Sequence, residues 1–281
     1  MTATKKAPPY FLHASQELQN LTSILKKFGI TYFTYLKKFP NGYHVNISSN
    51  PEWLEHYYKF ELYASSIFDN LKQPDHQEFV IWPAHSSNLP VFTHAENHFN
   101  TGNGVTIVKK TPFFHEFYFF SGKVEDTNLM NFYFNNIDLL QRFTFYWKNK
   151  AEKLLTTAEK HKIFIPNKLD NPVWEDNLSN KSLIVNSELI QDFLEAIKTR
   201  GYTFQGHDFQ KINFTSRELE CALCLLRGFT VREIAHKLYR SQRTIEKHVD
   251  NIKNKLNCQH KSDLIRELIR CGAHVYLKRQ T

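Results

Sequence analysis

The sequence predicts an α+β fold, with an N-terminal α-β-α layered domain followed by an all-α domain of four helices. Between residues 10 and 165, helical apolar stripes alternate with pairs of strand-like runs. From residue 214 onward, the apolar residues recur at helical spacing alone. The total net charge is +8, and residues 212–281 account for +7 of it, with 14 Lys and Arg against 7 Asp and Glu. The basic excess therefore belongs to the helical C-terminal domain. A concentration of positive charge favours contact with the phosphates of a nucleic acid.

The first part of the layered domain reads as a helix followed by a hairpin. Residues 1–10 are expected to form a loose arm, and apolar spacing predicts a helix over Ser15–Phe28 that ends at a glycine. Two runs rich in aromatic and β-branched residues follow, at 30–39 and 43–47. Asn41–Gly42 joins them, and this dipeptide is a strong hairpin signal.

The second part repeats the order of helix, strand pair and helix. A helix or helix pair is predicted over Pro51–Phe68, and Glu78–Trp82 is predicted as a short strand or the start of a loop. One strand surrounds Val105 and Ile107, and the next covers Phe113–Phe120. A long amphipathic stretch then runs from Thr127 to about His161. The domain is therefore assigned to residues 10–165.

Residues 166–211 are predicted to connect the two domains. Pro166, Pro172 and several asparagines indicate a linker. Apolar spacing then predicts one more helix over Ser187–Arg200, which is longer than a tether requires. We expect this helix to pack on the N-terminal domain or on its counterpart in a dimer.

The C-terminal domain, residues 212–281, contains two short amphipathic helices joined by a tight turn. Val231, Ile234, Ala235 and Leu238 form one apolar stripe, and Ile245, Val249, Ile252 and Leu256 form the next. Thr215 precedes Glu218 by three residues and Thr230 precedes Glu233 by three, so two helices begin with a capping box. Ser241 is placed to cap the third helix and Gly228 to end the first. An apolar face turned inward and a charged face turned outward suit insertion into a DNA major groove.

The run from Phe214 to Cys258 resembles the C-terminal helix-turn-helix of LuxR-type transcription regulators. The matching residues are Thr215, Arg217, Glu218, Gly228, Thr230, Glu233, Ile234, Ala235, Leu238, Ser241, Thr244, Ile245, His248, Asn251, Ile252, Lys255 and Leu256. The resemblance implies a compact four-helix domain that binds double-stranded DNA, usually as a homodimer on a two-fold site. The alternative is a helical bundle with a basic surface and no DNA role.

The polar face of the third helix carries the predicted DNA contacts. Arg243 and Lys247 are the leading candidates for base or phosphate contact, and Ser241 and Thr244 are placed near phosphate at the helix N-terminus. The other positions that reach the groove are Gln242, Glu246, Asp250 and Asn251. His248 borders the apolar stripe and is expected to pack. A fourth helix over Ser262–Arg270 is the dimer contact by resemblance, although its stripe also suits closure of the small core.

The N-terminal half resembles the ligand-binding domain of acyl-homoserine-lactone receptors. The segment NPEWLEHYYKFELY matches their pocket helix at Trp53 and Tyr57, Trp82 matches a second pocket tryptophan, and Gly104 matches the glycine that leads a strand pair. These receptors continue with an Asp-Pro that binds the ligand amide, whereas this chain has Ala64–Phe68 there. Without that carboxylate a homoserine lactone loses a charge-assisted hydrogen bond, which counts against a lactone as the ligand.

Two functions therefore stay open for the N-terminal domain. The aromatic side chains of Trp53, Tyr57, Tyr63 and Trp82 are flat apolar surfaces with polar edges, as found in small-molecule sites. They are equally suitable as ordinary core aromatics in a chain with 15% aromatic residues. In the first case the domain is a small-molecule receptor that controls dimerisation or DNA affinity. In the second it is a filled interaction or dimerisation module.

Other chemistries find little support in the sequence. His94 and His98 have helical i, i+4 spacing, but their neighbours favour a loop, so His76, His85, His94, His98 and His115 are interpreted as solvated histidines and no metal or cofactor is expected. Cys221 and Cys224 form a C-x-x-C that falls on an apolar stripe, where cysteine acts as a small hydrophobe. No nucleophile elbow, phosphate loop or long apolar segment is present, so we expect neither an enzyme nor a membrane protein. The expected location is the cytoplasm.

Overall fold

The computed structural model describes residues 6–65, 77–82, 89–111, 113–165, 187–197, 201–206 and 210–277. Its contacts divide the chain into two units. Unit 1 comprises Met1–Ile137 and Lys150–Phe193, and unit 2 comprises Asp138–Asn149 and Leu194–Thr281. The combination of a sheet-containing N-terminal unit and a mainly helical C-terminal unit confirms the predicted α+β class. No helix in the described ranges is long and apolar enough to cross a membrane.

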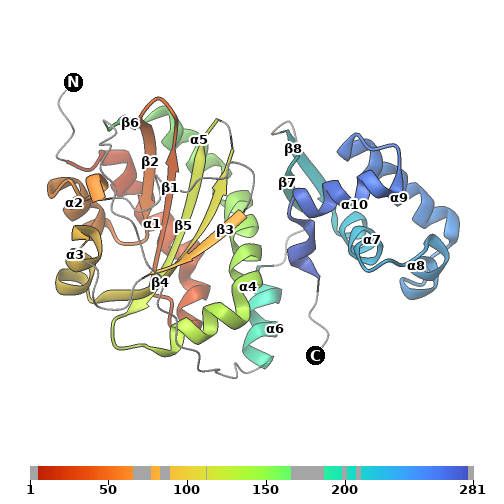
Figure 1. Cartoon of the computed structure of the whole chain (residues 1–281), viewed down its shortest axis with the longest axis horizontal. Coiled ribbons are helices and arrows are strands. Elements are labelled where there is room, and N and C mark those ends of the chain that lie inside the picture. Colours follow the sequence, from red (N-terminus) through yellow and green to blue (C-terminus); the bar gives the residue numbers. More distant parts are fainter. Residues whose placement is uncertain are drawn as a thin grey trace. The chain divides into compact units, whose positions relative to one another are not determined.

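Unit 1 is built on an antiparallel sheet with the strand order β3-β4-β5-β1-β2-β6 (Figure 1). Its strands are β1 (Tyr32–Lys38), β2 (Tyr43–Ser48), β3 (Gln77–Ile81), β4 (Thr101–Lys110), β5 (His115–Lys123) and β6 (Ile163–Phe164). The predicted hairpin of β1 and β2 is confirmed, and Gly42 takes the positive φ of 84° that its turn requires. The second strand pair is also confirmed, although β5 begins at His115 rather than Phe113 and ends at Lys123 rather than Phe120.

Helices cover both faces of the sheet. They are α1 (Pro9–Thr22), η1 (Ser23–Phe28), α2 (Pro51–Lys59), η2 (Leu62–Ser65), α3 (Pro90–Phe99), α5 (Glu152–Lys160) and the first part of α4 (Asn128–Lys150), whose residues Asp138–Asn149 belong to unit 2. On one face, the His44 ring of β2 hydrogen-bonds the Tyr58 hydroxyl of α2 at 2.7 Å. On the other face, Lys37 of β1 pairs with Glu159 of α5 at 2.7 Å. Because alternate residues of a strand point to opposite faces, these contacts confirm the α-β-α layering.

Two predictions about helices in unit 1 were wrong. The first helix begins at Pro9 rather than Ser15, because the proline at its first turn has a fixed φ and needs no N–H partner. The segment around His94 and His98 is the helix α3 and not a loop. Pro90 starts α3 in the same way, buried Phe92 and Ala95 hold its inner face, and Asn100 ends it with a φ of 47°.

The predicted helix after the linker is present as α6 (Ser187–Ala196), and Pro166 and Pro172 lie outside the described residues. Phe193 of α6 is buried, and its ring meets the Phe28 ring edge-on at 5.1 Å. Lys27 and Asp192 approach to 3.8 Å beside them. The start of α6 therefore packs on unit 1.

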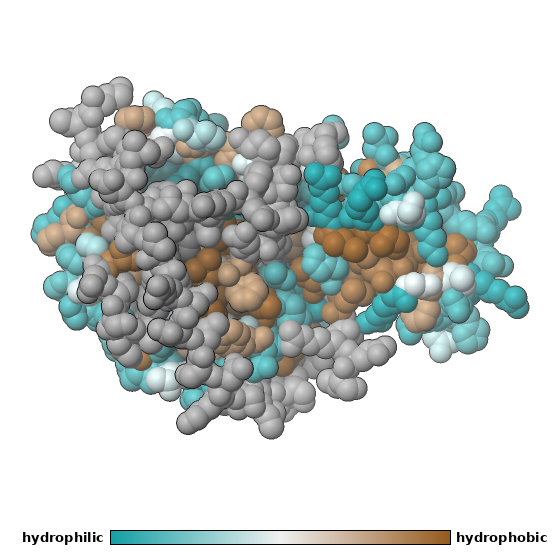
Figure 2. Space-filling model, viewed as in Figure 1, coloured by the Kyte–Doolittle hydropathy of each residue, from teal (hydrophilic) through white to brown (hydrophobic). Residues whose placement is uncertain are grey.

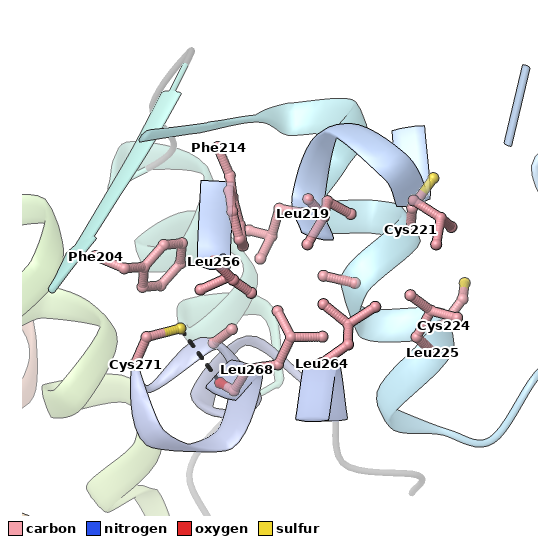
Figure 3. Packing of buried hydrophobic residues seen from close by; sticks show 14 of the residues in the cluster. Phe204, Phe214, Leu219, Cys221, Cys224, Leu225, Leu256, Leu264, Leu268 and Cys271 are labelled. Carbon is pink, nitrogen blue, oxygen red and sulfur yellow. Dashed lines mark hydrogen bonds between the residues drawn. The ribbon is translucent and has the colours of Figure 1, made fainter. Parts of the chain in front are cut away.

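Unit 2 contains a hairpin followed by the predicted helices. Its elements are β7 (Gly201–Gln205), β8 (Lys211–Thr215), α7 (Ser216–Leu226), α8 (Val231–Lys237), α9 (Gln242–Leu256), α10 (Lys261–Arg270) and η3 (Ala273–Tyr276). The β7–β8 hairpin was not predicted from the sequence. Its Phe204 and Phe214 rings pack together, with centroids 5.3 Å apart. Both rings join the hydrophobic core together with Leu256 and Leu268 (Figure 3).

The helix-start signals of unit 2 are confirmed. Thr215 with Glu218 and Thr230 with Glu233 form complete capping boxes. Gly228 follows α7 with a φ of 85°. Cys221 and Cys224 are free and buried in the core, as expected for small hydrophobes, and burial raises the pKa of the Cys221 thiol to about 12.

Candidate nucleic-acid interface and ligand cavity

The helix α9 separates its apolar and polar residues onto opposite faces. Ile245, Val249, Ile252 and Leu256 are buried in the core of unit 2. The predicted DNA-contacting residues Ser241, Gln242, Arg243, Thr244, Glu246, Lys247 and Asp250 are exposed, and Asn251 is half-buried. Hydrophilic side chains dominate the surface over α8 and α9 (Figure 2). The structure thus gathers the predicted contacts on one solvent-facing surface, which we call the α9 face.

The first turn of α9 is held by its cap. Ser241 Oγ accepts a hydrogen bond from the Thr244 backbone N–H at 3.1 Å, and the two hydroxyls lie 2.8 Å apart. The remaining N–H groups of this turn and the positive end of the helix dipole favour an anion there. Arg243 and Lys247 lie one turn apart and form no ion pair within the described ranges. Their charges are therefore available for phosphate.

An ion pair between an exposed lysine and a buried glutamate fixes the far end of α9. Lys255 Nζ of α9 donates to both carboxylate oxygens of Glu218 in α7, at 2.8 and 2.6 Å. Glu218 is only 3% exposed, and it also accepts the Thr215 N–H in the capping box at 2.8 Å. Burial raises the pKa of this carboxyl, but the hydrogen bonds from Lys255 and Thr215 outweigh it and the pKa is lowered. The ion pair therefore helps to fix the orientation of α9 relative to the first turn of α7.

Two residues beside the α9 face complete this surface. His248 is half-buried, with its Nδ1 enclosed and without a hydrogen-bond partner among the described residues, as expected for a packing residue. Tyr239, in the turn before α9, has a φ of 52° and a side chain that is 89% exposed. Sequence reasoning missed Tyr239, because an aromatic residue in a turn is normally assigned to the core.

Unit 1 contains a cavity of about 90 Å³ between the sheet and the helices α2 and α3. Space for one water needs only about 10–15 Å³, so this is more than a packing defect. The lining residues are Tyr32, Thr34, Leu36, Asn46, Trp53, Tyr57, Leu62, Trp82, Val91, Phe92, Ala95, Thr101, Phe119 and Ser121. The wall is mostly apolar and aromatic, with a few polar groups, as in small-molecule sites.

Trp82 forms one wall of the cavity, and Gly104 makes its position possible. The Trp82 backbone N–H donates to the Gly104 carbonyl at 2.8 Å, and its indole N–H donates to Thr106 Oγ1 at 2.8 Å. A Cβ on Gly104 would lie 2.3 Å from the indole ring. Gly104 therefore contributes to the cavity indirectly. Only a residue without a side chain leaves room for the Trp82 ring at this position.

Asn46 supplies a polar group that the sequence analysis did not select. It lines the cavity and is 3% exposed, and its Oδ1 is buried without a hydrogen-bond partner among the described residues. An unsatisfied buried acceptor costs about 1–3 kcal/mol. A ligand that brings an N–H or O–H to this wall would remove that cost.

The structure separates the predicted ligand-binding residues into two groups. Trp53, Tyr57 and Trp82 lie in the cavity wall. Tyr63 does not line the cavity; its ring lies 6.2 Å from that of Tyr57, and its buried hydroxyl has no partner among the described residues. The strand residues of the wall were not predicted, although alternation along β1 places Tyr32, Thr34 and Leu36 on one face of the sheet.

Comparison with known proteins identifies the C-terminal unit. The family model described as GerE, bacterial regulatory proteins of the luxR family, matches residues 212–268. The spore germination protein GerE of Bacillus subtilis strain 168 is 36% identical over 58 residues, which are 21% of this chain and 78% of that protein. The chain belongs to the luxR family. It is accordingly a DNA-binding transcription regulator with a helix-turn-helix in its C-terminal unit.

Solved structures resemble a larger share of this luxR-family chain, but weakly. Escherichia coli SdiA has 17% identity and a TM-score of 0.36, covering 93% of this chain and 92% of that one. SdiA in complex with octanoyl-rac-glycerol has 16% identity and a TM-score of 0.32, covering 92% and 88%. The phage VqmA–DPO complex has 14% identity and a TM-score of 0.23, covering 92% and 93%. Scores at this level establish nothing about the ligand of this chain.

Proposed function

We propose that this luxR-family regulator inserts the α9 face into the DNA major groove and binds as a homodimer in the cytoplasm. Arg243 and Lys247 contact phosphate or bases, and Ser241 and Thr244 contact phosphate at the start of α9. Gln242, Glu246, Asp250 and Asn251 read or exclude bases. The separation of buried and exposed residues along α9 supports this role.

The dimer contact in this proposal is the outer side of α10. Leu264 and Leu268 are fully buried and close the core of unit 2. Ile269 remains 50% exposed, and Ile265 is half-buried beside it. Replacing Ile269 with Lys is expected to weaken self-association in analytical ultracentrifugation without lowering the melting temperature. An unchanged dimer would place the contact elsewhere.

Unit 1, in the same proposal, binds a small molecule in its cavity and thereby controls dimerisation or DNA affinity. The observation that carries this part is the cavity itself, with its aromatic wall. The ligand is largely apolar, because the wall is, and it carries a hydrogen-bond donor for Asn46 Oδ1. The alternative of a filled interaction module predicts side chains in the space that Trp53, Tyr57 and Trp82 enclose, and the cavity argues against it.

Native mass spectrometry tests the ligand proposal most simply. The full-length protein, purified after exposure to culture extract, is expected to carry an adduct of small-molecule size that is absent from the denatured mass. Ala95 lines the cavity and is 4% exposed, so Ala95→Leu fills the space and should abolish the adduct.

A matched control lies on the same helix. Thr93 is on the exposed side of α3, so Thr93→Leu adds a leucine to the helix without entering the cavity. The adduct should persist in this variant. An adduct that survives Ala95→Leu, or a wild-type protein that never acquires one, would contradict a ligand in this cavity.

A further inference from the structure

Three histidines meet where α2 and α3 lie side by side (Figure 1). His94 and His98 are one turn apart on α3, and i, i+4 side chains of a helix share one face. His56 reaches them from α2, where its Nε2 lies 2.7 Å from His94 Nδ1. The three ring centroids are 5.0, 5.0 and 5.4 Å apart. One nitrogen from each ring falls within 4.8 Å of the others.

This cluster is distinct from the cavity, because none of its members lines the cavity. His56 and His94 are half-buried, and His98 is exposed, so the group is open to ions from solvent. The hydrogen bond between His56 and His94 uses one nitrogen of each ring. His98 makes no hydrogen bond within the described part of the chain.

The donor set selects a class of metal. Three imidazole nitrogens with no carboxylate among them suit zinc, copper or nickel, whereas calcium and magnesium require oxygen ligands. Three histidines with a remaining open position form a common tetrahedral arrangement for zinc. Bond lengths of about 2.0–2.1 Å place the nitrogens of such a site about 3.3 Å apart. In this structure the His56–His94 pair is 2.7 Å apart and the three nitrogens lie within 4.8 Å of one another, so the rings must shift to reach that spacing.

We propose that His56, His94 and His98 bind a divalent transition-metal ion of the zinc class. The ion links α2 to α3 outside the cavity. The residues that come next in the sequence after His56 and His94 are Tyr57 and Ala95, and both line the cavity. The bound metal therefore fixes the separation of two helices that form the cavity wall. This proposal does not depend on the cavity having a ligand.

Calorimetric titration of the full-length protein with Zn²⁺, after treatment with a chelator and dialysis, tests the site. The wild type is expected to bind one Zn²⁺ whose affinity falls at least about 100-fold in His98→Ala, since even loss of an outer partner of a ligand costs 10–100-fold. His98 is exposed, so its replacement should leave the metal-free melting temperature unchanged. His13 is an exposed histidine on α1, and His13→Ala is the matched control that should bind like the wild type.

Thermal unfolding supplies a second readout. Zinc at a hundredfold excess over its Kd should raise the melting temperature of the wild type and of His13→Ala by about 5 °C or more, but not that of His98→Ala. His94→Ala should behave like His98→Ala. Zinc binding that is equally strong in His98→Ala and the wild type, or no zinc binding by the wild type, would overturn the site.

Discussion

The two units present their candidate binding groups in opposite ways. On the α9 face the groups are polar or charged, exposed, and drawn from the single run between Ser241 and Asn251. In the cavity they are mostly aromatic or apolar, and they come from segments spread between Tyr32 and Ser121. The α9 face suits a charged partner that remains hydrated. The cavity suits an apolar ligand that loses its contact with water on binding. The two sites should therefore respond to different perturbations.

Salt should separate the two sites most strongly. Each phosphate contact releases counterions, so the affinity of the full-length protein for DNA should fall at least about 100-fold between 50 and 200 mM salt. Retention of the small-molecule adduct should change little over the same range, because apolar burial involves no counterion release. Fluorescence anisotropy with labelled DNA and native mass spectrometry measure the two quantities. A flat salt profile for DNA would remove the α9 face from phosphate contact.

Substitution of Glu218 tests how the α9 face is supported. Glu218→Gln weakens the ion pair of this buried carboxylate with Lys255 and should lower the free energy of unfolding of unit 2 by about 1.5–3 kcal/mol. Glu233 occupies the same position in an exposed capping box, so Glu233→Gln should cost less. Urea denaturation followed by circular dichroism compares the two variants. Equal losses would show that the Lys255 pair contributes nothing.

The Glu218 carboxyl also makes the stability of unit 2 depend on pH. Because the pKa of Glu218 is lower in the folded than in the unfolded state, its stabilisation is complete above the ordinary carboxyl value of about 4.3 and is lost as the pH falls through the lowered pKa. Wild-type stability should therefore decline in acid more steeply than that of Glu218→Gln. Parallel stability curves for the two proteins would contradict this linkage.

Replacement of Gly104 tests the support of the cavity in unit 1. Gly104→Ala puts a methyl group where the Trp82 indole lies, so the ring must move away from Thr106. We expect a loss of about 1–2 kcal/mol in stability, as for overpacked cores, and loss of the adduct. Gly201 has ordinary space around an added Cβ, so Gly201→Ala is the control and should keep the adduct. If Gly104→Ala retains the adduct, Trp82 is not a required wall.

The smallest effect is expected for single charges on the α9 face. Lys247→Ala should weaken DNA binding about threefold to tenfold and reduce the salt slope by about one. Lys160 is an exposed lysine on α5 of unit 1, and Lys160→Ala removes the same charge away from the α9 face. The control should match the wild type in anisotropy titrations. An equal loss of DNA affinity in Lys247→Ala and Lys160→Ala would indicate only an effect of the protein's net charge.

Much of unit 2 could be predicted from the sequence because its signals are local. Capping boxes span three residues, and the stripe of α9 repeats every three or four, so Thr215, Thr230 and Ser241 already mark the helix starts. The hairpin of β7 and β8 escaped prediction because its short strands acquire their pattern from the core that Phe204 and Phe214 join. Propensity alone does not determine such strands.

The cavity and the histidine cluster of unit 1 could be predicted only in part. Trp53, Tyr57 and Trp82 were found through a resemblance, whereas Asn46 and Ala95 become neighbours only when the sheet and α3 assemble. His56 lies 38 positions before His94 and carries no spacing signal. The interpretation of His94 and His98 as loop residues hid the one local signal that existed, their i, i+4 spacing.

The central claim is that occupation of the cavity in unit 1 alters DNA binding by unit 2. The most direct test is the affinity of the full-length protein for a DNA site selected from a random library, measured with the adduct bound and after its removal. We predict that the Kd differs by about fivefold or more between the two forms, and that Ala95→Leu gives one Kd under both treatments. An identical Kd for the loaded and the emptied wild type would contradict the claim.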